Sequence, residues 1–156
     1  MNEIEEFLSE SNKIEEVFDE DSLTQALHAW DYLSKQKEMS IGVVLKTHKI
    51  LMLHQLLLPS EKGYFRQVNV RVGNHICPDW TLVPSLFSDW LKQWGNAKKA
   101  GDIKQAHIEL NKIHIFLDGN GRTSRMIMNY QRLKAGLSLL IIHTGKEQMA
   151  YYKWWD

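Results

Sequence analysis

Apolar positions recur at helical spacing over most of the chain. The segment that starts near Ser22 places them three or four residues apart, which is the spacing of one helix face. The same reasoning predicts helices over residues 4–11, 22–33, 40–58, 84–94, 102–113, 121–134 and 146–155. The sequence has three prolines and nine glycines, so long stretches contain no helix breaker. These patterns predict an all-α protein.

Two segments depart from the ordinary amphipathic pattern. Residues 40–58 are apolar around much of the helix circumference, which is typical of a central buried helix, and Pro59 is expected to end it. Residues 64–76 have the period of a half-exposed strand, because valine alternates with polar residues from Val68 to Val72. The pair Gly73-Asn74 supplies turn chemistry. We therefore expect a helical bundle around a buried helix, with a short hairpin or extended loop.

Composition narrows the class of protein. A chain of 156 residues has the usual size of a single domain, and no linker or repeat divides residues 1–156. Nineteen basic residues balance nineteen acidic ones, whereas a dedicated nucleic-acid binder normally has a basic excess. No apolar run approaches the roughly 20 residues that span a bilayer. The single cysteine, Cys77, rules out an internal disulfide. We expect a cytoplasmic domain that binds neither nucleic acid nor membrane.

Histidine spacing gives no zinc site. His48 and His54 are six residues apart, which does not place them on one helix face, and His107 and His114 are two helical turns apart. We expect His54 and His107 to be packed or hydrogen-bonded.

The chemistry is concentrated in residues 114–125, His-Ile-Phe-Leu-Asp-Gly-Asn-Gly-Arg-Thr-Ser-Arg, which lie between two predicted helices. The turn Gly119-Asn120-Gly121 leads into a helix N-terminus, where free N–H groups and the helix dipole favour an anion. Arg122 and Arg125 are three residues apart and project from one face of the first turn. Two guanidinium groups beside such a turn predict a polyphosphate site.

Two further side chains in this segment suit a group-transfer reaction. Asp118 offers the hard oxygen that Mg²⁺ uses when it bridges phosphates. His114 has an unperturbed pKa near neutrality and can take a proton from a hydroxyl nucleophile. A lone Gly-Asn-Gly or Arg-x-x-Arg would be read as a capped loop with solvated arginines. The joint pattern favours one catalytic site.

This segment resembles the signature of the Fic (filamentation induced by cAMP) family, H-x-F-x-[D/E]-G-N-[G/K]-R-x-x-R, with Ile115 in place of the usual proline. Residues 63–76 are similar to the family's flap, a β-hairpin over the active site. The segments Ile50–His54 and Tyr151-Tyr152 also resemble recurrent Fic segments. Together these similarities cover most of the chain.

The resemblance implies a Fic fold and an adenylyltransferase that moves AMP from ATP to a Ser, Thr or Tyr hydroxyl of a protein. It implies these roles: His114 as general base, Asp118 as ligand of Mg²⁺, Gly119, Asn120 and Gly121 as the anion hole, Arg122 at the polyphosphate and Arg125 at the γ-phosphate. Phe116 is assigned to the core.

Two more sites follow from the resemblance. The flap would clamp an extended segment of the target by strand-like pairing; its residues are Val68, Asn69, Val70, Arg71, Val72 and Gly73. Tyr151 or Tyr152 would line the adenine pocket. The implied partners are ATP and a target protein, with the enzyme itself as a further acceptor, and the sequence leaves an oligomer open.

Residues 1–21 contain a segment similar to the family's inhibitory motif, [S/T]-x-x-x-E-[G/N]. Ser11 and Glu15 fit it, and Glu16 departs from the expected glycine or asparagine. The resemblance implies that Glu15 pairs with Arg125 and keeps ATP in an unproductive pose. Because the first 21 residues are acidic, the alternative is a solvated acidic helix face.

Three alternatives remain for the function. The same scaffold can use another nucleotide donor, or it can remove AMP from a modified protein with Glu15 activating water. The third is a catalytically silent nucleotide sensor, against which the intact His114 and Asp118 argue.

Overall fold

The computed structural model describes all 156 residues. The helices are α1 (Glu3–Ile14), α2 (Glu20–Ser34), α3 (Ile41–Leu51), α4 (Val83–Trp94), α5 (Ala100–Ile113), α6 (Asn120–Lys134) and α7 (Lys146–Tyr152). Short 3₁₀ turns span Pro59–Glu61, Trp80–Leu82 and Lys153–Trp155. The predicted all-α class with a small hairpin is confirmed. No helix combines the length and the apolar character that a membrane span requires.

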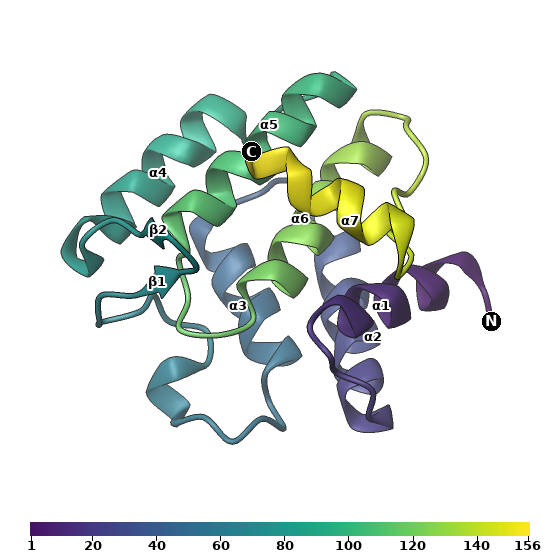
Figure 1. The fold of residues 1–156 in the computed structure, drawn as a ribbon, viewed down its shortest axis with the longest axis horizontal. Helices are drawn as coiled ribbons and strands as arrows, with labels where there is room; N and C mark the ends of the chain where they lie inside the picture. The colour runs from purple at the N-terminus through teal and green to yellow at the C-terminus, as the bar shows by residue number, and fades with distance from the viewer.

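Helix α6 occupies the centre of the bundle, with α4 and α5 on one side and α1, α2 and α3 on the other (Figure 1). Its residues from Arg122 to Gln131 are all buried, whereas α3 buries only four of its side chains. The prediction that residues 40–58 form the central helix is therefore wrong. The sequence misleads because α6 buries many polar side chains, which an apolar pattern does not detect.

Helix α3 also ends earlier than predicted. Its last residue is Leu51, and residues 52–57 form turns and bends. Leu53, Leu56 and Leu58 are exposed. Because these leucines bury no apolar surface against the core, tertiary packing does not stabilise a longer helix here. Pro59 opens a 3₁₀ turn of its own.

The hairpin is shorter than the valine alternation predicted. Strands β1 (Arg71–Val72) and β2 (His75–Ile76) pair antiparallel around the Gly73-Asn74 turn. Gly73 adopts the left-handed φ of +58° that this turn requires. All four strand residues are exposed, so only the ladder and its anchors on the body stabilise the hairpin. One anchor is the His75 ring, whose Nε2 donates to the Lys112 carbonyl at 3.0 Å.

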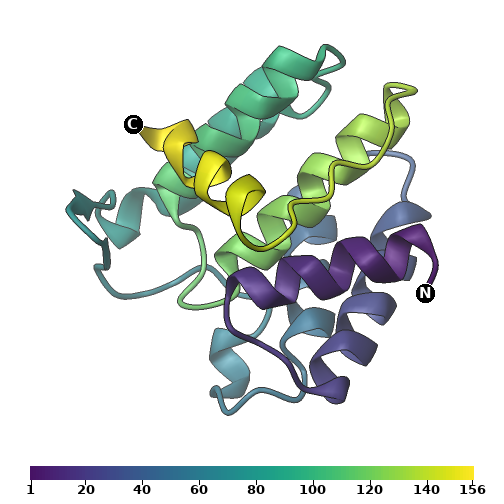
Figure 2. The ribbon, with the colours of Figure 1, turned by 45° about the vertical axis from the view of Figure 1, so that its right-hand side comes forward.

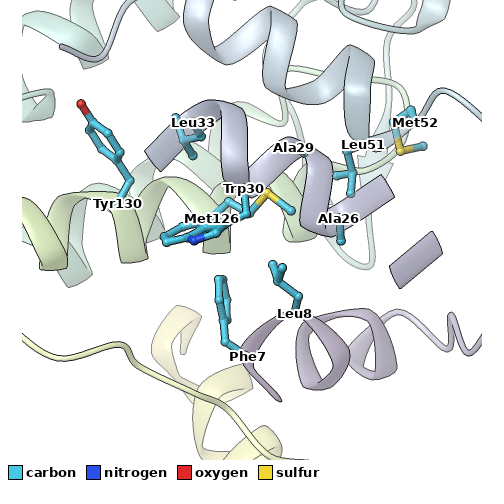
Figure 3. Close-up of a cluster of buried hydrophobic side chains, with 10 residues drawn as sticks. All are labelled: Phe7, Leu8, Ala26, Ala29, Trp30, Leu33, Leu51, Met52, Met126 and Tyr130. Carbon is cyan, nitrogen blue, oxygen red and sulfur yellow. The ribbon is translucent and has the colours of Figure 1, made fainter. Parts of the chain in front are cut away.

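A hydrophobic cluster fixes α1 on the body of the domain (Figure 3). Its members come from α1, α2, α6 and the end of α3; they are Phe7, Leu8, Ala26, Ala29, Trp30, Leu33, Leu51, Met52, Met126 and Tyr130. The Phe7 and Trp30 rings meet edge to face, with centroids 5.5 Å apart. This docking brings the C-terminal end of α1 beside the N-terminal end of α6 (Figure 2).

Candidate active site

The motif segment begins where α5 ends. His114 is the C-cap of α5 and has a left-handed φ of +55°, which turns the chain away from the helix axis. The loop that follows is closed by Asn120. Its Oδ1 accepts from the Phe116 N–H at 2.9 Å, and its Nδ2 donates to the Phe116 carbonyl at 2.7 Å. Phe116 is fully buried, as predicted. Asn120 therefore shapes the loop as well as starting α6.

His48 of α3 holds the same loop from the outside. Its Nδ1 accepts from the Gly63 N–H at 2.9 Å, so the ring hydrogen is on Nε2, which donates to the Asp118 carbonyl at 2.7 Å. The ring stacks on Phe116 with centroids 3.6 Å apart. Burial lowers the pKa of His48 to about 4, so the ring is neutral at pH 7. The sequence did not point to this role, because the partner lies 70 residues away.

The predicted anion cradle lies at the N-terminus of α6. The N–H groups of its first turn have no acceptor within the helix. Gly119 has a φ of +82°, and a Cβ there would stand 2.8 Å from the Met52 sulfur. A Cβ on Gly121 would overlap the carboxylate of Glu15. Both glycines are thus required by close approach, Gly119 to Met52 and Gly121 to the Glu15 carboxylate.

Arg122 is buried with part of its hydrogen-bonding capacity unused. Its side chain is 4% exposed, and neither Nε nor Nη1 has a partner. Its Nη2 lies 3.6 Å from the Met52 sulfur, a weak acceptor. Burial lowers the pKa of the guanidinium. Unpaired buried donors cost stability, and such groups in folded proteins commonly mark a functional site.

Arg125 is buried, and each of its three side-chain nitrogens has a hydrogen-bond partner. Its Nε donates to Ser11 Oγ at 2.7 Å, and its Nη2 donates to the Ser11 carbonyl at 3.0 Å. Its Nη2 also pairs with Glu15 Oε1 at 2.8 Å. Its Nη1 donates to the Tyr151 hydroxyl at 3.3 Å. The structure thus brings together Ser11, Glu15 and Arg125, as the family resemblance implied.

Glu16 ends α1 in an unusual way. Its N–H bonds to the Lys13 carbonyl and the Val17 N–H bonds to the Asn12 carbonyl, which is the Schellman arrangement of a helix C-terminus. Glu16 occupies the left-handed position of this motif, with φ at +57°. Glycine or asparagine is normally found there, which gives a physical reason for the residue types expected at this position. The turn fixes Glu15 where it meets Arg125.

His114 is positioned by Arg66, a buried residue just before the hairpin. The Arg66 Nε donates to the His114 carbonyl at 2.6 Å, and its other nitrogens bind carbonyls of Val68, Pro78 and Ile113. Burial, and then the positive Arg66, lower the pKa of His114. The imidazole is therefore neutral at pH 7 and able to accept a proton. Arg66 lies within residues 63–76, which resemble the flap, but no local sequence pattern indicated its role.

Asp118 is the hard-oxygen donor of the motif. Its Oδ1 accepts from the Gly119 N–H at 2.8 Å, and the residue is exposed. The structure contains no group of three or more side chains that could hold a metal ion. A single carboxylate beside an anion cradle fits Mg²⁺, which commonly binds one or two carboxylates together with substrate phosphates.

Two cavities meet at the motif. The larger, of about 390 Å³, extends between the hairpin and the C-terminal segment, and the smaller, of about 110 Å³, covers the cradle. Both are lined by Glu15, His114, Asn120 and Gly121. Arg125, Tyr151, Tyr152 and Val72 line the larger cavity only, and Asp118, Gly119 and Arg122 the smaller only. Val68 instead lines a separate groove, and Asn69, Val70, Arg71 and Gly73 line neither cavity.

Comparison with known proteins places this geometry in context. A profile of the Fic/DOC family matches residues 44–131. The protein adenylyltransferase Fic of Drosophila grimshawi is 36% identical over 133 residues, which cover 80% of this chain and 27% of that protein. Its namesake from Drosophila willistoni is 35% identical over 129 residues, covering 77% and 24%. The chain thus spans about a quarter of the length of these curated relatives.

Solved structures share the fold. Fic-1 from C. elegans aligns with a TM-score of 0.79 at 20% identity, over 98% of this chain and 55% of that one. A Fic family protein from Desulfovibrio desulfuricans G20 aligns with a TM-score of 0.74 at 22% identity, over 97% and 54%. The fold, the motif of residues 114–125 and the matched profile lead to one conclusion: the chain belongs to the Fic/DOC family.

Proposed function

We propose that this chain binds ATP together with Mg²⁺ and transfers AMP to a hydroxyl group of a target protein. One observation carries the proposal. A neutral, half-buried histidine and a helix N-terminus border two joined cavities, and a buried arginine with unpaired donors borders the smaller of the two. The smaller cavity suits phosphates and the larger, more apolar cavity suits the base.

The reaction balances with these groups. The target hydroxyl attacks the α-phosphorus while His114 accepts its proton, and the bond from the α-phosphorus to the bridging oxygen of pyrophosphate breaks. Negative charge then grows on the leaving pyrophosphate, so donors on the β and γ side stabilise the transition state. Arg122 and the first-turn N–H groups of α6 supply those donors, and Arg125 is assigned to the γ-phosphate. Mg²⁺ held by Asp118 would neutralise charge between the α- and β-phosphates.

The flap is proposed to present the target. Strand β1 ends at Val72, which lines the larger cavity, and β1 pairs only with β2. Its other edge is open to an added strand, whose main chain would bond to it while the acceptor side chain points toward His114. The proposed acceptor is a Ser, Thr or Tyr in an extended segment.

The proposed brake is Glu15. Its carboxylate takes an Nη2 hydrogen of Arg125 and fills the space beside Gly121. A γ-phosphate would compete for the same guanidinium and would meet a like charge. Because α1 belongs to the same chain and packs on the core, the inhibition is intramolecular.

The test uses ATP labelled at the α-phosphate, Mg²⁺ and a cell lysate. We expect label on protein with Glu15→Gly, little with the native chain, and none with Glu15→Gly combined with His114→Ala. Glu16→Gly is the matched control, because it makes the same change one residue further on without touching Arg125. Equal labelling by the native and Glu15→Gly proteins would refute the brake, and labelling that survives His114→Ala would refute the base.

A second candidate is removal of AMP from a modified protein. It is favoured by the position of Glu15, whose side chain is 40% exposed and borders both cavities, so that its carboxylate can accept a proton from water. Adding the native chain to targets labelled by Glu15→Gly tests it: release of labelled AMP supports removal, and stable label excludes it. Competition by unlabelled CTP, GTP and UTP in the first assay tests the choice of donor.

A further inference from the structure

A buried polar chain stands behind Arg125 and links it to α5 and α7. His107 of α5 is 2% exposed, and its Nε2 lies 2.8 Å from the Tyr151 hydroxyl. On its other side, Nδ1 faces the Ser124 carbonyl at 3.3 Å. Asn111 donates to the His107 carbonyl at 2.8 Å and to Ser124 Oγ at 3.0 Å, which fixes the backbone at both ends.

The donor and the acceptor of each hydrogen bond from Arg125 through Tyr151 and His107 to Ser124 can be assigned. Arg125 Nη1 can only donate, so the Tyr151 oxygen accepts from it. The Ser124 carbonyl can only accept, so the hydrogen of the neutral His107 ring is on Nδ1. Nε2 is then an acceptor and takes the hydrogen of the Tyr151 hydroxyl. Burial lowers the pKa of His107 to about 3, so a single ring proton at pH 7 agrees with this assignment.

The partners of Arg125 divide into two groups. Ser11 and Glu15, both in or capping α1, take the hydrogens on Nε and Nη2. Tyr151 is the one hydrogen-bond partner outside α1, and its ring also faces the guanidinium, with the Arg125 Cζ 5.8 Å from the centroid. When Glu15 withdraws, an Nη2 hydrogen becomes free, while Nη1 keeps its contact with Tyr151.

We propose that Tyr151 and His107 are positioning residues, which hold the Arg125 guanidinium so that its freed Nη2 edge meets the terminal phosphate of a nucleoside triphosphate. This inference rests on the proposed function of the site. In this proposal the Tyr151 hydroxyl positions Arg125, and this role is separate from the place of Tyr151 in the lining of the larger cavity.

The substitution Tyr151→Phe separates hydroxyl from ring, and Tyr130→Phe is its matched control. Tyr130 lies on the same helix as Arg125 and is 5% exposed. The substitution Tyr130→Phe removes one comparable hydrogen bond, which the hydroxyl donates to the Gln36 carbonyl at 2.8 Å. In the Glu15→Gly protein we expect Tyr151→Phe to weaken ATP binding about tenfold, as for one lost hydrogen bond to a charged group, and to leave AMP binding unchanged. The KM for ATP should rise with kcat nearly constant.

Changes at His107 test the second link. His107→Leu removes the acceptor and should reproduce the loss of ATP affinity, while His107→Gln retains both an acceptor and a donor and should restore part of it. Equal ATP and AMP losses, or the same loss in Tyr130→Phe, would overturn the proposal.

A measurement without nucleotide keeps this inference distinct from the proposed function. In ¹⁵N spectra of the Glu15→Gly protein, the Arg125 Nη hydrogens should exchange slowly with water, and Tyr151→Phe should speed their exchange where Tyr130→Phe does not. Unchanged exchange in Tyr151→Phe would refute the positioning role even if AMP transfer is found. Faster exchange together with absent ATP binding would leave the positioning of Arg125 supported and overturn the proposed function.

Discussion

Replacing Glu16 by glycine should stabilise the protein, although it removes a large side chain. Glu16 is exposed, its φ is +57°, and its side chain makes no hydrogen bond or ion pair. A left-handed residue with a Cβ costs roughly 1–2 kcal/mol. Glycine does not have this cost, but its greater conformational freedom in the unfolded chain lowers the stability by roughly 0.5–1 kcal/mol. The net gain in the free energy of unfolding is about 0.5–1 kcal/mol, or a rise in Tm of about 1–4 °C.

Chemical and thermal unfolding of Glu16→Gly, Glu16→Ala and the native chain check this prediction. Alanine keeps the Cβ, so Glu16→Ala should gain little or nothing. If the alanine variant gains as much as the glycine variant, or if Glu16→Gly is destabilised, then backbone strain at the end of α1 is not the cause.

Three further predictions concern other residues. Arg122→Met should raise the free energy of unfolding by about 1–3 kcal/mol, because two unpaired buried donor nitrogens disappear. In the Glu15→Gly protein, the same substitution should abolish the increase in Tm that ATP causes. Gly119→Ala should destabilise the protein by about 1–3 kcal/mol in urea unfolding, because the φ of Gly119 is +82° and a Cβ there would meet the Met52 sulfur. The control Gly101→Ala, in α5 with open space around it, should stabilise the protein by about 0.5–1 kcal/mol. His143 pairs with a glutamate of α1 and with one of α7, and these contacts raise its pKa to about 8. Its contribution to the free energy of unfolding is complete below pH 6.5 and is lost as the pH rises through about 8. Between pH 6 and pH 9, urea unfolding should therefore show a larger decrease in stability for the native chain than for His143→Gln.

The sequence predicted well wherever the information is local. Residues 114–125 form one continuous segment, so their grouping needed no knowledge of the fold. Helix ends marked by breakers were also close: α4 begins at Val83, beside Pro84, and α6 ends at Lys134, just before the left-handed Gly136.

What the sequence could not predict depends on partners that are distant along the chain. The bond from His48 to the Asp118 carbonyl spans 70 residues, and that from Arg125 to Ser11 spans 114. No local pattern reports such contacts. The central position of α6 was missed for the same reason, because its buried polar side chains find their partners on other elements. The pairing of Glu15 with Arg125 was predicted only through the family resemblance.

The most direct test of the account compares ATP labelled at the α-phosphate with ATP labelled at the γ-phosphate, using the Glu15→Gly protein, Mg²⁺ and lysate. The account predicts that protein retains the α label and never the γ label, because the bond broken joins the α-phosphorus to departing pyrophosphate. Retention of the γ label would instead mean transfer of the terminal phosphate. Failure to retain either label, in a protein that still binds ATP, would contradict AMP transfer altogether.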